Sequence, residues 1–209
     1  MTEPIDIFFA TGNAHKVGEM QALADDSKLA LRLRSAKEAG GMPAVVEDTG
    51  TFLGNARKKA RALHEKLDGG KWVLSDDSGL CVDALNGEPG VESANYAGEG
   101  ATSAANLIKL LGQLQRVPRE ARTAHFICVL FVVEPGGREH NFVGRCDGRL
   151  LECARGQGGF GYDPIFVPAQ SHLTFAELGE AVKNGISHRA LAWAKFAEWW
   201  RGRAAGAPT

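Results

Sequence analysis

The chain has 209 residues, of which 44% are hydrophobic and 23% charged, a balance typical of a soluble globular protein that can bury a core. Its formal net charge is −1, from 24 basic and 25 acidic side chains, so it has no overall positive field to hold a nucleic acid or an anionic membrane. Any phosphate-bearing partner must therefore be held by a few locally placed groups.

The remaining bulk features indicate a protein of a reducing compartment. No apolar run approaches the roughly 18 residues that a membrane span requires. The first residues, MTEPIDIFFATGN, lack the basic start and long apolar core of a signal peptide. The cysteines, Cys81, Cys128, Cys146 and Cys153, show neither C-x-x-C pairing nor a zinc-ligand spacing with histidine, so we interpret them as small hydrophobic side chains. We expect a cytoplasmic protein with no membrane and no nucleic acid partner.

Hydrophobic periodicity divides the first half of the chain into short strands and helices. The predicted elements are a strand at 5–10, a helix from Ala14, a strand at 29–33, a glycine-rich loop at 39–43 and an amphipathic helix at 52–67. In the second of these helices, Ala56, Ala60 and Leu63 lie on one face. We assign its basic residues to the other faces: Arg57, Lys58, Lys59 and Arg61.

The second half of the chain predicts longer strands and a C-terminal helix. Its elements are strands at 72–74 and 80–85, a turn at 86–90, a helix at 102–117, a strand at 124–133 that turns back into one at 138–146, a further strand at 150–154 and a helix after the N-cap Ser187. There is no regular βαβ repeat. We therefore expect an α/β protein with a mixed twisted sheet, flanking helices and two lobes around a central cleft. It would form one domain over residues 1–203, followed by a flexible tail at 204–209.

Two aspartates, Asp76 and Asp77, stand side by side in the apolar run WVLSDDSGLCVDAL of residues 72–85. Neighbouring carboxylates repel each other, and burying either one costs free energy unless a partner offsets it. Magnesium is such a partner, and the pair Glu47-Asp48 at the end of another apolar run would bring it further oxygen ligands. The alternative is a turn at Ser78-Gly79 that keeps both aspartates in water.

The segment TGNAHK, residues 11–16, lies at a predicted strand-to-helix junction. Backbone N–H groups at a helix start, together with a lysine on the first turn, form a local anion site. The P-loop pattern G-x-x-x-x-G-K-[ST] is absent. A capped turn with a surface lysine is the alternative interpretation.

The glycine-rich segment 156–161 matches the dinucleotide-binding pattern G-x-G-x-x-G in its letters. That fold requires a helix to open at the last glycine, whereas the following residues YDPIFVP are apolar and interrupted by prolines. We therefore reject a Rossmann fold. What remains is a glycine loop carrying Phe160 and Tyr162, suited to enclosing a flat ring, or else a plain loop.

Three basic or titratable side chains, Lys183, His188 and Arg189, surround the predicted start of the C-terminal helix. Positive charge is unfavourable at a helix N-terminus because of the helix dipole. The placement favours a nearby anion or another ligand that accepts hydrogen bonds, although an ordinary surface helix remains open. Together with the other segments, it describes a site for a magnesium–phosphate compound bearing a ring.

Five motifs in chain order resemble the inosine triphosphate pyrophosphatase family, which hydrolyses non-standard purine nucleoside triphosphates. They are Thr11-Gly12-Asn13-x-x-Lys16-x-x-Glu19, the stretch SDDSGL at 75–80, the stretch NGEPGVESANYAG at 86–98, the stretch GFGYDP at 159–164 and the stretch ISHR at 186–189. The resemblance spans residues 7 to 195. It implies a mixed α/β fold of two lobes with the site between them, a homodimer, and magnesium-dependent hydrolysis of ITP, dITP and XTP to the monophosphate and pyrophosphate.

The resemblance also implies roles for individual residues. Asp77 would be the general base, and Glu47 and Asp77 would bind the metal. The residues implied to bind substrate are Thr11, Gly12, Asn13, Ala14, His15, Lys16, Ser78, Phe160, Gly161, Tyr162, Asp163, Lys183, His188 and Arg189. Donors such as Lys183 suit a 6-oxo purine, which presents an acceptor where adenine presents an amino group.

The chain departs from the family pattern at two places. The segment Thr51-Phe52-Leu53-Gly54-Asn55-Ala56 is one residue shorter than usual and has glycine in place of glutamate, which leaves Glu47 and Asp48 as competing metal ligands, and we prefer Glu47. Asn95 stands where relatives often have arginine. Two other functions compete: a pyrophosphatase for modified pyrimidine nucleotides, disfavoured by the segment 11–16, and a nucleotide-binding regulator without turnover, disfavoured by the aspartate pair.

Overall fold

The computed structural model describes residues 3–204, and its strands form a mixed sheet in the order β2-β1-β3-β4-β5-β6. The strands are β1 (Ile5–Phe9), β2 (Leu31–Ser35), β3 (Trp72–Val82), β4 (Thr123–Val133), β5 (Glu139–Leu150) and β6 (Phe166–Pro168). The helices are α1 (Ala14–Ser27), α2 (Phe52–Lys66), α3 (Ser103–Gln113), α4 (Phe175–Ile186) and α5 (His188–Ala204). Short 3₁₀ turns lie at Ala36–Ala39, Asp83–Leu85, Gly90–Glu92 and Arg119–Ala121.

The sheet combines parallel and antiparallel pairing, as predicted. β1 lies parallel to β2 and, over Trp72–Leu74, parallel to β3, while β5 and β6 are antiparallel. Between β4 and β5 the chain reverses at a tight turn in which the Glu134 N–H donates to Arg138 O (2.8 Å). The prediction of an α/β fold with a mixed sheet and flanking helices is therefore confirmed.

The described chain divides into two units. The first comprises residues 3–77, 128–143 and 192–204, and the second comprises residues 78–127 and 144–191. Strands β3, β4 and β5 each continue from one unit into the other, so that Asp77 ends one unit and Ser78 begins the next. The central cleft stays a prediction.

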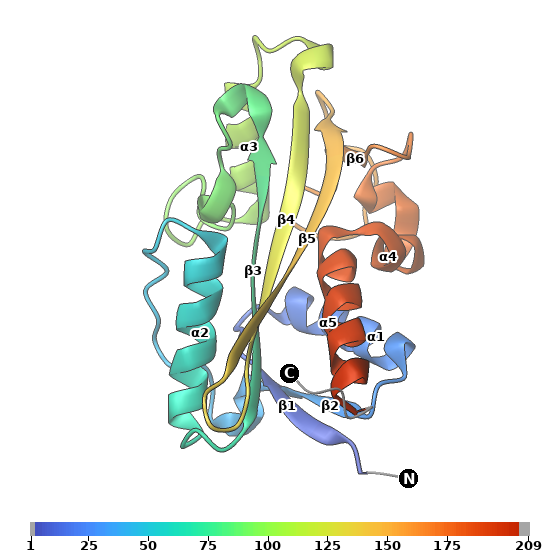
Figure 1. Ribbon diagram of the computed structural model, residues 1–209. Helices are drawn as coiled ribbons and strands as arrows, with labels where there is room; N and C mark the ends of the chain where they lie inside the picture. The colour runs from blue at the N-terminus through green and yellow to red at the C-terminus, as the bar shows by residue number, and fades with distance from the viewer. Residues whose placement is uncertain (1–2, 205–209) are drawn as a thin grey trace. The chain divides into compact units, whose positions relative to one another are not determined.

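In the first unit, alternate side chains of β3 point to opposite faces of the sheet, as strand geometry requires. Ser75 Oγ donates to Ala56 O of α2 (2.6 Å), and Val73 belongs to the apolar cluster that α2 completes. Trp72 instead packs edge-on against Trp200 of α5, with ring centroids 5.1 Å apart. Figure 1 accordingly shows α2 and α5 on opposite sides of this part of the sheet.

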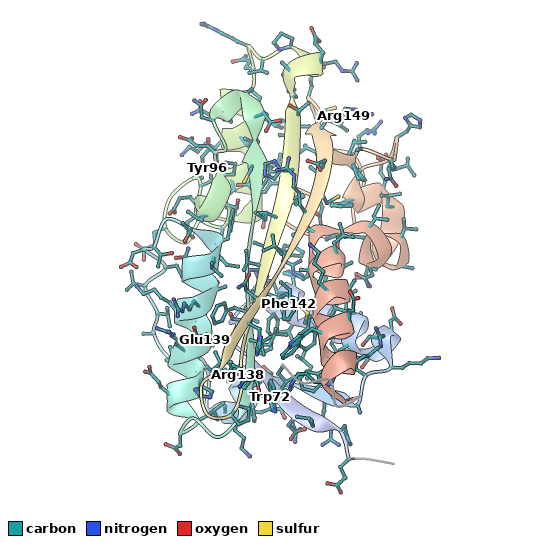
Figure 2. All side chains as sticks on the ribbon, in the orientation of Figure 1. Trp72, Tyr96, Arg138, Glu139, Phe142 and Arg149 are labelled. Carbon is teal, nitrogen blue, oxygen red and sulfur yellow. The ribbon has the colours of Figure 1, made fainter. Side chains whose placement is uncertain are left out.

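The start of β5 follows the same alternation. Glu139 forms ion pairs with Arg57 and Arg61 of α2, whereas Phe142 packs against Phe196 of α5 with ring centroids 5.7 Å apart. Figure 2 shows Phe142 beside α5 and Glu139 turned toward α2. The two helices are thus attached to the sheet by different chemistry, α2 partly by charge and α5 by aromatic packing.

The second unit has a separate apolar core. Leu80 and Val82 of β3 pack there with Phe126 of β4, Leu110 of α3 and Phe175 of α4. This core is independent of the first unit's cluster and supports the loops that follow β3 and β5. None of the helices within residues 3–204 has the length and apolar composition that crossing a bilayer requires.

Several predicted elements differ from the structure. β3 is a single strand through residues 75–79, where we predict an interruption. The strand predicted at 150–154 is wrong: Leu150 ends β5, and the Leu151 N–H donates instead to Ile165 O (2.9 Å) outside any strand. The pattern also does not predict α4, which Gly179 interrupts with φ 75° and ψ 161°. Such a break hides the helical period, and only glycine adopts this conformation readily.

The ends of the predicted helices are close to those observed. α3 ends at Gln113, four residues before the predicted end at 117, and α5 begins directly after Ser187, as predicted. α5 extends to Ala204, and residues 205–209 of the predicted tail lie outside the described residues. All four cysteines are free thiols, in keeping with their interpretation as unpaired side chains.

Candidate active site

The adjacent aspartates of β3 are both buried, with Asp76 0% and Asp77 6% exposed. Because the strand continues through them, their side chains point to opposite faces of the sheet. The alternative of a solvated turn at Ser78-Gly79 is therefore wrong. Alternation separates the two carboxylates, and each has a lysine of its own from a different helix.

Asp76 is paired with the first turn of α1. Lys16 Nζ lies 3.1 Å from Asp76 Oδ1, and the lysine side chain is mostly buried. The turn that carries Lys16 is capped by Asn13, whose Oδ1 accepts hydrogen bonds from the backbone N–H groups of His15 (2.9 Å) and Lys16 (3.2 Å). The Asn13 N–H in turn donates to Thr11 Oγ1 (3.2 Å).

This geometry bears on the predicted anion site at residues 11–16. The segment forms the strand-to-helix junction that we predict, and Gly12, Asn13, Ala14 and His15 are exposed. Two of the N–H groups expected to hold phosphate are bound to the Asn13 side chain instead. A phosphate would therefore meet the Lys16 ammonium first, or compete with Asn13 for the helix start.

Asp77 faces α2 and lies in a chain of charges. Lys59 Nζ is 3.0 Å from Asp77 Oδ1 and 2.7 Å from Glu47 Oε2, so one ammonium joins the two carboxylates that we predict to bind metal. Burial raises the pKa of Asp77 to about 6, although the positive charges of Lys59 and Lys16 oppose that rise. Lys59 is itself buried, yet its pKa is raised because the surrounding carboxylates outweigh desolvation.

Lys59 contacts both Glu47 and Asp77, but the sequence does not identify it as a candidate site residue. We assign it to a polar face of its helix, but it lies three residues after Ala56 and four before Leu63, on the apolar face. The i, i+3 and i+4 spacing of a helix was the signal that could have found it. A lysine on a buried face requires an anionic partner, and the neighbouring β3 supplies Asp77.

The two acidic residues that compete for a metal role have different partners in the structure. Glu47 contacts Lys59, which also contacts Asp77, whereas Asp48 pairs with Lys58; both acidic residues are exposed. The segment is fixed by Thr49, whose Oγ1 donates to Asn55 Oδ1 (2.8 Å).

This contact also accounts for Gly54, at a position where the family resemblance implies glutamate. Gly54 N–H donates to the N-cap Thr51 Oγ1 (3.1 Å), so Gly54 occupies the position at which a capping-box glutamate would stand. A Cβ atom on Gly54 would overlap Thr49 Oγ1. The shorter segment therefore excludes any side chain here, and the hydroxyl of Thr49 fills that space.

A hard divalent cation fits the chemistry of this group. Asp77 Oδ2 is buried and has no hydrogen-bond partner among residues 3–204, and Glu47 and Asp77 approach the same ammonium. Magnesium is bound in proteins by one or two carboxylates with water and substrate oxygens, rather than by a full protein cage. Within residues 3–204, no group of three or more histidine, cysteine or acidic residues is arranged so that it could hold a metal ion.

The second unit brings together the other predicted site residues. Arg189 Nη2 donates to Ser78 Oγ (3.2 Å), although the two residues are 111 positions apart in the chain. His188 stacks on Phe126 of β4, with ring centroids 4.7 Å apart and planes inclined by 12°. Both His188 and Arg189 are at least 95% buried. They are therefore built into the unit rather than placed on a surface helix.

The glycine loop is organised by a buried ion pair. Asp163 Oδ2 accepts from the Phe160 N–H (2.9 Å) and from Lys183 Nζ (2.6 Å). Lys183 Nζ also lies 4.9 Å from the centroid of the Phe160 ring, and the Arg189 guanidinium carbon lies 5.9 Å from it. An aromatic face flanked by two fixed cations can hold a flat, electron-rich ring.

One feature of this loop was predictable and one was not. No helix opens after Gly161, and α4 begins only at Phe175, so the rejection of a Rossmann fold is confirmed. Tyr162, which we predict to bind substrate, is buried in the apolar core and its hydroxyl donates to Ser93 O (3.0 Å). That hydroxyl therefore serves a contact within the protein.

The fold and both groups of side chains indicate an enzyme of phosphate chemistry, and comparisons with known proteins identify the family. The Ham1 family model matches residues 7–199. A dITP/XTP pyrophosphatase of Opitutus terrae is 58% identical over 199 residues, covering 93% of this chain and 98% of the relative. The dITP/XTP pyrophosphatase of Geobacillus kaustophilus is 46% identical over 195 residues, covering 93% and 94%.

Solved structures agree with these sequence relatives. A HAM1 protein from Coxiella burnetii superposes with a TM-score of 0.84 at 36% identity, covering 94% of this chain and 98% of that one. The nucleoside-triphosphatase / dITP/XTP pyrophosphatase of Mycobacterium abscessus gives a TM-score of 0.73 at 38% identity, covering 92% and 97%. The chain therefore belongs to the Ham1 family.

Proposed function

We propose that this protein hydrolyses the non-standard purine nucleoside triphosphates dITP, XTP and ITP to the monophosphate and pyrophosphate, and so removes them from the nucleotide pool. The observation that carries the proposal is Asp77, a buried carboxylate whose Oδ2 has no hydrogen-bond partner within residues 3–204. The relatives named dITP/XTP pyrophosphatase, at 46% and 58% identity over more than nine-tenths of the chain, support the substrate class.

Asp77 acts as the general base in this proposal. Its pKa of about 6 is close to the pH of the cell, so the carboxylate is mostly ionised yet still able to take a proton from water. Lys59 Nζ, 3.0 Å away, holds Oδ1, so Oδ2 is the oxygen available for a carboxylate–metal–water arrangement. Hydrolysis of a phosphoanhydride requires mainly an aligned nucleophile and neutralised charge, which is what this arrangement supplies.

The triphosphate would be held from α1. Lys16 provides the positive charge, and Thr11 with the exposed residues 12–15 provides backbone and side-chain donors around the helix start. The charged groups around the two aspartates are the ammonium groups of Lys16 and Lys59 and three carboxylates. The carboxylates are those of Glu47, Asp76 and Asp77, so the sum of the formal charges is −1. An incoming polyphosphate therefore requires further positive charge.

Magnesium would supply that charge, held by Glu47 and Asp77. When bound, it would neutralise the phosphate oxygens and lower the pKa of bound water. The orientation of both ligands rests on this chain's own residues. Lys59 aligns the two carboxylates in the metal-free protein, and the contact between Thr49 and Asn55 fixes the segment that carries Glu47.

The base would be selected in the second unit. Phe160 offers a ring face, and Lys183 and Arg189 lie within 6 Å of that face as hydrogen-bond donors. A 6-oxo purine presents an acceptor to such donors, whereas adenine presents an amino group, which is itself a donor and cannot accept from them. Two donors that face each other in a buried site cost free energy, and this cost would discriminate between the two bases.

The cellular setting follows from the same proposal. A nucleotide-pool enzyme acts in the cytoplasm, and we propose that this protein works there as a homodimer. The free cysteines fit a reducing compartment. Mass measurement of the purified protein in solution tests the dimer directly.

Product analysis with purified protein tests the function. The protein is incubated with magnesium and, in separate reactions, dITP, XTP, ITP, GTP and ATP, and the products are separated by ion-exchange chromatography. We expect monophosphate and pyrophosphate from the first three and little from the last two. Orthophosphate release would show that a different bond is cut, and binding without turnover would identify a nucleotide-binding regulator.

A further inference from the structure

Ser93 lies at a junction of three segments in the second unit. Its Oγ accepts from the Leu80 N–H (2.9 Å) and donates to Gly90 O (2.6 Å). Its carbonyl oxygen accepts from the Tyr162 hydroxyl (3.0 Å) and from Asn106 Nδ2 at the long distance of 3.5 Å. Through its side chain and its carbonyl, Ser93 thus connects its own segment to β3, to α3 and to the glycine loop.

The contact with Leu80 has a clear origin in the sheet. β1 pairs with β3 only over Trp72–Leu74, where Leu74 O accepts from the Ala10 N–H (2.7 Å). Alternate residues present their backbone groups to the same edge of a strand, so Leu80 and Val82 face that edge beyond the end of β1. Ser93 Oγ and Glu88 O accept their N–H groups (2.9 and 3.1 Å).

The segment 86–98 is held firmly on its other side. Asn106 of α3 is 96% buried, accepts from the Ala97 N–H (2.7 Å) and donates to Ala94 O (2.8 Å). Ser93 is therefore not a passive member of a loose loop. Its carbonyl is fixed relative to β3 and α3, and it offers Tyr162 a fixed acceptor.

Tyr162 transmits this position to the glycine loop. It stands one residue before Asp163, whose Oδ2 holds both the Phe160 N–H and Lys183 Nζ. The Tyr162 ring is buried in the core, so its hydroxyl bond to Ser93 O fixes both the depth and the rotation of the loop. A shift at Tyr162 would move Phe160 and Lys183 together.

We propose that Ser93 and Tyr162 are positioning residues that set base selectivity by fixing the loop of Phe160 and Asp163 against β3. The inference rests on the proposed function, because it assumes that this loop receives the base. Neither hydroxyl touches the nucleotide in this account. Both act through Asp163, which in turn places the ring of Phe160 and the ammonium of Lys183.

The test compares two tyrosine variants that each lose one hydroxyl. Tyr162→Phe removes the bond to Ser93, and the control Tyr96→Phe removes a bond of similar length from the Tyr96 hydroxyl to Glu88 Oε2 (3.1 Å) in the same segment (Figure 2). The readout is the ratio of kcat/KM for dITP to kcat/KM for dATP. We expect Tyr162→Phe to lower this ratio about fivefold, the effect of one hydrogen bond, and Tyr96→Phe to leave it unchanged.

A second readout separates positioning from general damage. Inorganic tripolyphosphate lacks a base, so its inhibition constant should be the same in both variants and in the wild type. Ser93→Ala should lower the selectivity ratio as Tyr162→Phe does, and Ser93→Thr, which keeps the hydroxyl, should restore it. If Tyr162→Phe does not fold, Ser93→Ala decides the question.

A selectivity ratio that stays within twofold of the control in either folded variant overturns the inference. So does an equal loss of kcat/KM for both substrates, because a purely structural role would act on them alike. Failure of the proposed function has a different signature: the wild-type protein would then release no pyrophosphate from dITP.

Discussion

Lys59 Nζ lies 3.0 Å from Asp77 Oδ1, and both side chains are buried. An ammonium at this distance stabilises the ionised carboxylate, while burial opposes ionisation. Burial prevails, because the pKa of Asp77 is raised to about 6 in spite of the lysine. Lys59 therefore limits the rise of that pKa and keeps the carboxylate available as a base near neutral pH.

Replacing Lys59 with methionine should raise the pKa of Asp77 further. The substitution removes the charge that opposes the effect of burial and keeps an apolar side chain of similar length. The carboxyl carbon of Asp77 can be followed by NMR in ¹³C-aspartate-labelled, metal-free protein over a pH titration. Lys58→Met is the matched control, since Lys58 is its neighbour on α2 but pairs with exposed Asp48. An unchanged or lower pKa in Lys59→Met would contradict this account.

Asp77→Asn should abolish activity and stabilise the fold, in a way that depends on pH. The carboxyl has a pKa of 3.8 in an ordinary setting and about 6 in the folded protein. Between those values the folded state binds more protons than the unfolded chain, so the free energy of unfolding falls as the pH rises through the window. The variant lacks this titration. It should be more stable than the wild type by about 1–3 kcal/mol near pH 8, with no such gain near pH 4.

Urea unfolding in the presence of a chelator measures this difference at the two pH values. Turnover of dITP should fall at least about 100-fold in the same variant, the range expected on loss of a general base. Equal stabilisation at both pH values would show that the charge of Asp77 is not its cause. Retained turnover would remove Asp77 from the mechanism.

Glu47→Gln and Asp48→Asn form a matched pair that tests the metal site. Both residues are exposed, but Glu47 contacts Lys59 beside Asp77, whereas Asp48 pairs with Lys58. We expect Glu47→Gln to raise the magnesium concentration for half-maximal activity at least about tenfold, and Asp48→Asn to change it by less than about twofold. Magnesium titration of the initial rate gives both values. The reverse order would assign the metal to Asp48.

Gly159→Ala should disturb the base-facing loop more than Gly161→Ala. Both glycines have positive φ, 71° and 61°, so alanine is strained at either position. Only at Gly159 would the added Cβ overlap Asp163 Oδ2, which holds Phe160 and Lys183; at Gly161 it would meet nothing within 4 Å. Steady-state kinetics should show a fall in kcat/KM for dITP of about tenfold in Gly159→Ala and a smaller one in Gly161→Ala. Equal losses would mean that strain alone is responsible.

The elements that follow local rules were predictable from the sequence. β1, α1, α2, β4 and α5 lie where hydrophobic periodicity and capping residues place them. The aspartate pair was a sound signal for a buried charged site, because carboxylates in an apolar run require partners. The predicted interruption of β3 at this pair is wrong. The strand continues through both aspartates because a lysine on each face of the sheet pairs with one of them.

The features that depend on distant contacts were not predictable. Lys59 has no acidic partner nearby in the sequence, because its partner Asp77 lies 18 positions further along the chain and is brought to α2 by β3. Ser93 and Tyr162 are 69 positions apart, and no local pattern connects them. α4 was missed because Gly179 breaks its period. In each case the deciding partner comes from another part of the fold.

The edge of β3 beyond Leu74 has a consequence for handling the protein. Leu80 and Val82 belong to an apolar strand, and their N–H groups at this edge are covered by segment 86–93 rather than by another strand. An apolar strand with an uncovered edge is a template for pairing with a second chain. We therefore expect proteolytic cleavage within that segment to expose this edge and promote aggregation, so that the integrity of the chain should be checked in any preparation.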